Sequence, residues 1–92
     1  MQKEIEVIIK GRVQMVMFRD FAKRKADNFG LYGTVENLND NSVRIIAQGD
    51  ENKLKEFIKL LKTGPMFAKV NDVDVRWKKI EEKFTDFKIV WT

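Results

Sequence analysis

One stretch of the chain combines residue types and spacing that suit the binding of an anion. It runs Gly11-Arg12-Val13-Gln14-Met15-Val16-Met17-Phe18-Arg19, between a strand-like segment and a helix-like segment. A loop that enters a helix presents unpaired backbone N–H groups and the positive end of the helix dipole. Arg19 adds a guanidinium fork, whose geometry matches phosphate or carboxylate. The stretch therefore predicts a site for one of these anions.

The segments on either side of this stretch have different periods. Residues 4–13 alternate between apolar and mostly charged side chains, with Ile8 as the apolar exception on the charged side, which predicts a half-buried strand. After Met17 the apolar residues follow helical spacing and predict one buried helix face. They are Phe18, Phe21, Ala22, Ala26 and Phe29. Gly30 is a natural residue to end that helix.

A hairpin is expected next along the chain. Residues 31–38 and 42–48 have strand patterns, and Asn39-Asp40-Asn41 between them is typical of a turn. Asn41 tolerates the left-handed backbone region, which such turns often need. Gly49 is expected to break the second strand.

Asp50 is a suitable cap for a second helix, and Thr63-Gly64-Pro65 would end it. The buried stripe of this helix would consist of Leu54, Phe57, Ile58 and Leu61. Alternation then returns in residues 73–78 and 87–91, joined by a polar connection, residues 79–86.

This order of elements predicts an α+β fold of the ferredoxin-like βαββαβ type. An antiparallel sheet of four to five strands would carry two helices on one face. With 92 residues, the chain is long enough for one core, so residues 1–92 are expected to form a single domain.

Composition excludes several kinds of chemistry. The sequence contains no cysteine and no histidine, which rules out disulfides, Ser-His and Cys-His nucleophilic pairs, and thiolate or imidazole metal sites. The net charge of +4 favours anionic partners but does not separate small phosphates from nucleic acid. Since no apolar run approaches 18 residues and no signal-peptide pattern opens the chain, we expect a cytoplasmic protein that does not bind membranes.

The loop and several later positions resemble the acylphosphatase family. The pattern of that family is Gly-x-Val-Gln-Gly-Val-x-Phe-Arg, then Gly-Leu at the end of the helix, then Gly-x-Val-x-Asn on the next strand. The matching residues here are Gly11, Val13, Gln14, Val16, Phe18, Arg19, Gly30, Leu31, Gly33, Val35 and Asn37. Gly49, Gly64-Pro65 with Ala68, and Phe87-Lys88-Ile89 also resemble the family, so the likeness extends over nearly the whole chain.

The resemblance implies hydrolysis of the carboxyl-phosphate bond of small acyl phosphates, without metal, cofactor or covalent enzyme intermediate. Arg19 matches the phosphate-binding arginine of the family, and Asn37 matches the asparagine that orients the attacking water. Residues 13–18, which we call loop 13–18, would hold the other phosphate oxygens with their backbone amides. The implied substrate-binding residues are Gln14, Met15, Val16, Met17, Phe18 and Arg19. We expect a monomer that binds no nucleic acid.

Met15 departs from the pattern, because the family has glycine at this position. If the backbone φ of Met15 is positive, the residue adds roughly 1–2 kcal/mol of local strain. If φ is negative, the side chain can point outward at little cost. The loop would then either still bind phosphate or be distorted, leaving a non-catalytic anion-binding domain. Met17 is interpreted as a residue that fills a gap in the loop.

Two other functions fit the fold class. Domains of this type also bind RNA through aromatic residues on the open face of the sheet, but residues 43–48 contain no aromatic residue and no RNA-binding motif. Alternatively, Ile8, Ile46 and Val90 could form an apolar patch for a protein partner. Taken alone, Arg19 would be typical of a solvated residue at a helix start, and Asn37 of a residue at a strand end.

Overall fold

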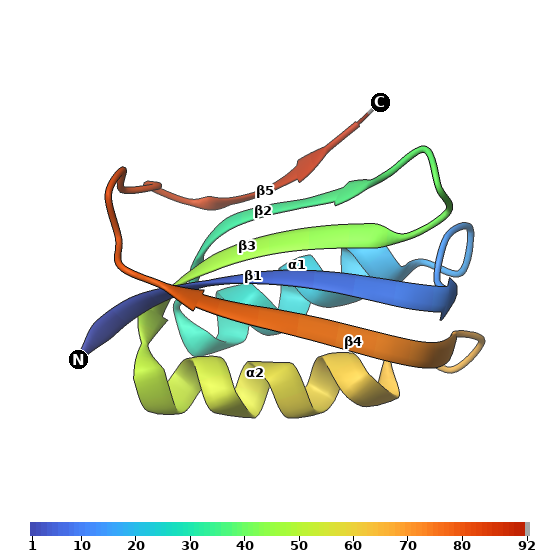
Figure 1. The fold of residues 1–92 in the computed structure, drawn as a ribbon, viewed down its shortest axis with the longest axis horizontal. Coiled ribbons are helices and arrows are strands. Elements are labelled where there is room, and N and C mark those ends of the chain that lie inside the picture. Colours follow the sequence, from blue (N-terminus) through green and yellow to red (C-terminus); the bar gives the residue numbers. More distant parts are fainter. Residues whose placement is uncertain (92) are drawn as a thin grey trace.

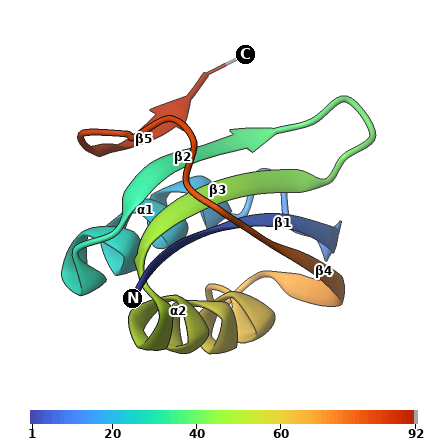
Figure 2. The same cartoon turned by 60° about the vertical axis from the view of Figure 1, so that its left-hand side comes forward.

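The structure, a computed structural model that describes residues 1–91, has the predicted order of strands and helices (Figure 1). The elements are β1 (Gln2–Arg12), α1 (Phe18–Phe29), β2 (Tyr32–Asn37), β3 (Val43–Asp50), α2 (Glu51–Thr63), β4 (Lys69–Lys78) and β5 (Phe87–Val90). Both helices lie on the same face of the sheet (Figures 1 and 2). The ferredoxin-like α+β architecture is confirmed. Neither helix is long and apolar enough to cross a membrane, within the part of the chain described.

The sheet is mixed rather than wholly antiparallel. Its strand order is β4-β1-β3-β2-β5, and only the last pair, β2 with β5, is parallel. Residues 79–86 cross one end of the sheet, from the edge at β4 to the opposite edge (Figure 2). A connection that stays at one end must return the chain in the direction opposite to β4. Because β2 already runs that way, β5 is parallel to it.

The core lies between the sheet and the two helices. Alternate residues of the strands face the helices, and the predicted stripes of the helices meet them. The buried apolar residues include Ile5, Val7, Ile9, Phe18, Ala22, Ala26, Val35, Val43, Ile45, Leu54, Phe57 and Leu61. Phe21, Phe29 and Ile58 are half-buried and lie at the margins of the stripes.

The helix ends follow the expected capping. Gly30 follows α1 in the left-handed region, with φ of 68°, and its N–H donates to Asp27 O. The Asp50 carboxylate accepts a hydrogen bond from Asn52 N–H and caps α2. Asn41 also has the expected positive φ, at 72°.

Gly49 does not break a strand, contrary to the prediction. β3 continues through it to Asp50, and Gly49 pairs with Lys3 of β1. The reason for glycine is space: a Cβ on Gly49 would lie 2.4 Å from Leu31 Cδ2. Leu31 is itself buried, directly after α1. Glycine here permits close packing between the end of α1 and the sheet.

We therefore expect Gly49→Ala to lower the free energy of unfolding by about 1–3 kcal/mol, the usual cost of overpacking a core. Chemical denaturation would measure this loss. Leu31→Ala also destabilises, by leaving a cavity, but the double variant should lose less than the sum of the two losses because each change makes room for the other. Strict additivity would show that the two positions do not share this space.

Candidate active site

Loop 13–18 connects β1 to α1 through two methionines in the left-handed region. Met15 has φ of 62° and Met17 has φ of 63°, a conformation that costs non-glycine residues energy and is common at functional sites. The Met15 side chain is 98% exposed, so positive φ and an outward side chain occur together. Met17 is 70% exposed, and its interpretation as a gap-filling residue is wrong.

The N-terminus of α1 offers backbone donors to this loop. The first helical hydrogen bond runs from Phe21 N–H to Met17 O, at 3.0 Å. The N–H groups of the three helical residues before Phe21 therefore lack helical acceptors. Met17, at the cap position, has no side-chain hydrogen bond that would cap them. This helix start has the electrostatic character of an anion site.

A cavity of about 400 Å³ adjoins the helix start and brings most of the predicted residues together. It is lined by Val13, Met15, Met17, Phe18, Arg19, Asp20, Asn37 and Trp91. Two predicted loop residues are missing from its lining: the Val16 side chain packs against the core, and Gln14 turns away toward the β2–β3 hairpin. Arg19 and Asn37, 18 positions apart in the sequence, thus share one cavity.

Asn37, the last residue of β2, carries a polar atom without a partner. Its Oδ1 is buried and accepts no hydrogen bond from residues 1–91. A buried acceptor left unpaired costs about 1–3 kcal/mol, which proteins seldom leave uncompensated. Asn37 also lines the cavity, where a side-chain amide suits the binding of a water or of a polar ligand group.

Arg19 is not paired with its acidic neighbour. The Asp20 carboxylate accepts from Arg24 Nε at 2.9 Å, one helical turn further on. The Arg19 guanidinium instead lies over the Trp91 ring, with its central carbon 4.2 Å from the ring centroid. Sequence analysis missed Trp91, because only the pairing of β5 with β2 reveals that it borders the cavity.

The Gln14 side chain has a role that sequence analysis also missed. Its Nε2 donates to Leu38 O at 2.8 Å and to Ser42 O at 2.9 Å, at the two ends of the β2–β3 turn. Within that turn, the Asp40 carboxylate accepts from the Ser42 hydroxyl and N–H, and these bonds lower the pKa of Asp40. Gln14 thereby fixes loop 13–18 to the turn that follows Asn37.

A larger cavity, of about 580 Å³, lies near the N-terminus and the end of β4. It is lined by Met1, Gln2, Lys3, Trp77, Lys78, Lys79, Ile80 and Lys83. These residues include no arginine and no helix terminus, so we assign the candidate site to the smaller cavity.

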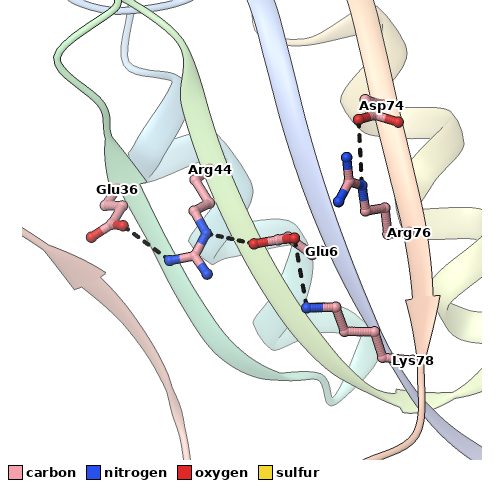
Figure 3. Close-up of polar contacts among 6 residues, drawn as sticks. All are labelled: Glu6, Glu36, Arg44, Asp74, Arg76 and Lys78. Atoms are coloured by element: carbon pink, nitrogen blue, oxygen red, sulfur yellow. Dashed lines mark hydrogen bonds and ion pairs between the residues drawn. The ribbon is translucent and has the colours of Figure 1, made fainter.

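Figure 3 shows ion pairs on the open face of the sheet, the face on which Ile8, Ile46 and Val90 were proposed to form an apolar patch. Arg44 Nε donates to Glu6 at 2.8 Å, Arg44 Nη1 reaches Glu36 at 3.4 Å, and Lys78 lies 3.6 Å from Glu6. The hydrogen bond from Arg44 lowers the pKa of Glu6. Ile46 is paired with Glu6, and Ile8 with Arg44, so charged groups interrupt the patch. This arrangement does not favour a docking surface.

Comparisons with known proteins agree with one another. The family model described as Acylphosphatase matches residues 5–89. A curated relative named acylphosphatase, from Dehalococcoides mccartyi, is 42% identical over 86 residues, covering 92% of this chain and 94% of its own length.

Solved structures give the same result. The crystal structure of acylphosphatase from Bacillus subtilis is similar with a TM-score of 0.94 at 40% identity, covering 99% of this chain and 100% of its own. An acylphosphatase from Coxiella burnetii gives a TM-score of 0.91 at 30% identity, covering 97% of this chain and 93% of its own.

The two hydrogen bonds of Gln14 predict a measurable contribution to stability. Gln14→Met keeps a similar shape but removes both donors, and should lower the free energy of unfolding by about 1 kcal/mol. Gln14→Glu should cost more near neutral pH, because a carboxylate would face two carbonyl oxygens. That extra loss should shrink as the pH falls, since a protonated carboxyl can donate. Equal, pH-independent losses in urea denaturation would contradict this role.

Proposed function

The chain belongs to the acylphosphatase family, and on that premise we propose which of its groups hydrolyse an acyl phosphate to carboxylate and inorganic phosphate. Hydrolysis of acyl phosphates is the activity of the family, and this chain is a hydrolase. We assign it to residues 1–92 acting as one acylphosphatase-like domain, without a metal or cofactor, on small acyl phosphates.

Arg19 and the backbone amides of loop 13–18 with the first turn of α1 hold the phosphoryl group in this proposal. During transfer, negative charge spreads over the three equatorial phosphoryl oxygens. A guanidinium fork and convergent N–H donors stabilise that charge without reorganising during the reaction. The observation that carries the assignment is the cavity that Arg19 shares with Asn37 at an uncapped helix start.

Asn37 orients the water that attacks phosphorus. Asn37 lines the cavity together with Arg19, and its side-chain amide can donate and accept hydrogen bonds, which supports this role. The chain has no histidine to act as a base, so the phosphate oxygen of the substrate accepts the proton of the water. A pH–rate profile in which an essential group of the enzyme titrates near neutrality would contradict this step.

Met15 is compatible with activity in this proposal. Its side chain is almost fully exposed and so packs against little of the loop, and its φ keeps the left-handed conformation that glycine adopts freely. The alternative, a non-catalytic anion-binding domain, would require an occluded or distorted loop. Arg19, Asn37 and the helix start nevertheless meet at one cavity.

Arg19→Ala should reduce kcat/KM for benzoyl phosphate by about 10³-fold, because it removes the side-chain charge that faces the phosphoryl group. It should also raise the Ki of inorganic phosphate. Lys53→Ala is the control, since it also removes an exposed cation from a helix, but from α2 and not from the cavity lining. Equal activity of Arg19→Ala and the parent would reject the site.

Asn37→Ala should instead lower kcat by about 10²-fold while the Ki of inorganic phosphate changes little, because it affects the water rather than the anion. Asn28→Ala, on the exposed side of α1, is the control. A large rise in the phosphate Ki with unchanged kcat would assign Asn37 to phosphate binding instead.

Met15→Gly should leave kcat/KM within about threefold of the parent and raise the free energy of unfolding by about 0.5 kcal/mol. The gain is small because relief of left-handed strain is partly offset by the greater freedom of glycine in the unfolded chain. Met15→Val should destabilise, since a branched residue tolerates positive φ poorly. An inactive parent that regains activity with Met15→Gly would show that Met15 has disabled the loop.

A further inference from the structure

Trp91 lies beside the candidate site because of how β5 pairs with β2. The parallel register pairs Gly33 with Phe87, Val35 with Ile89 and Glu36 with Val90. Trp91 directly follows β5, and it lines the same cavity as Asn37, the last residue of β2. The last part of the described chain therefore returns an aromatic ring to the cavity that Arg19 lines.

The Arg19 guanidinium lies over the face of the Trp91 ring. The distance of 4.2 Å from the guanidinium carbon to the ring centroid is within the range of a cation–π pair. The N–H donors of a guanidinium lie in its plane, at its edges. One aromatic contact restrains the side chain but cannot occupy all five donors, so donors remain available to an anion. Within residues 1–91, Arg19 makes no side-chain hydrogen bond or ion pair that would compete.

A second contact holds β5 against the same face of α1. Lys23 lies one turn after Arg19, and its Nζ donates to Phe87 O at 2.9 Å. Arg19 and Lys23 are i and i+4 on the helix, so they point to the same side. The two contacts lie at opposite ends of β5, with Phe87 at its start and Trp91 after its end.

Core packing does not explain Trp91. The residue is 71% exposed, although the neighbouring Phe87 is buried at 2%. An exposed indole normally stabilises a fold very little, so its position over a functional arginine requires another account. A long arginine side chain loses rotamer freedom when it binds an anion, and prior restraint of that side chain favours binding.

We propose that Trp91 is a positioning residue that holds the Arg19 guanidinium in the orientation that receives the phosphoryl group. The inference rests on the proposed function, in which Arg19 binds phosphate. It assigns no contact between Trp91 and the reacting atoms. Its effect should therefore be seen in the binding of the anion, whatever the acyl group of the substrate.

The test is the Ki of inorganic phosphate, a product, against hydrolysis of benzoyl phosphate and of acetyl phosphate. Trp91→Ala should raise this Ki about three- to tenfold, the range expected for loss of a partly solvated cation–π pair. KM for both substrates should rise by a similar factor. Trp91→Phe should restore most of the binding because it keeps an aromatic face, whereas Trp91→Leu should resemble Trp91→Ala.

Trp77→Ala is the matched control, because Trp77 is the other tryptophan and lies away from the site, on β4. It should leave the Ki unchanged. The thermal midpoints of the Trp91 variants should stay close to that of the parent, which separates positioning from a loss of fold.

Two results would overturn the inference: an unchanged Ki in Trp91→Ala, or a Ki for Trp91→Leu equal to that of the parent. Arg19→Ala shows whether a negative result concerns only the role of Trp91 or the whole proposed site. If it loses phosphate binding while the Trp91 variants do not, only the role of Trp91 is wrong. If Arg19→Ala itself binds phosphate like the parent, the proposed site is wrong.

Discussion

The burial of Phe18 is the contact on which the geometry of the site depends. Phe18 is the first residue of α1 and, at 1% exposure, one of the two phenylalanines that are the largest fully buried side chains. A helix anchored at its first residue cannot slide or rotate without exposing that ring, which would cost several kcal/mol. Arg19 and the free N–H groups of the first turn follow directly from this anchor. The rigid core thus fixes the position of the helix start, while Gln14 and Trp91 restrain the more exposed parts around it.

The sequence was sufficient for the parts of the structure that depend on local pattern. Alternation and helical spacing identified the strands and helices, and the family resemblance led to Arg19 and Asn37, which the fold brings to one cavity. Gly49 was wrongly predicted to end a strand, because glycine is uncommon inside strands. Its role here depends on packing against Leu31, 18 positions earlier in the chain. The Gln14 side chain, the parallel pairing of β5 and the position of Trp91 depend on contacts between distant segments, which no local period encodes.

The site also concentrates local costs in a chain that is otherwise conventionally packed. Three such features lie close to the same cavity: the positive φ of Met15 and Met17, the helix start without a side-chain cap, and the unpaired Oδ1 of Asn37. Such features reduce stability when the cavity holds no ligand, and they are expected where a bound anion or water completes the missing interactions. The hydrophobic core provides the surrounding stability that tolerates them.

The short length of β5 has a consequence for the dynamics of the site. A four-residue strand at the edge of a sheet leaves one side of its backbone without a neighbouring strand, and such strands open at a lower free energy than central ones. Each local opening of β5 would withdraw the indole from Arg19 while the core stays folded. The fraction of molecules in which Trp91 restrains Arg19 would therefore depend on fraying of this strand and not on global unfolding. The rate of amide exchange in β5 and the affinity for phosphate would then vary together.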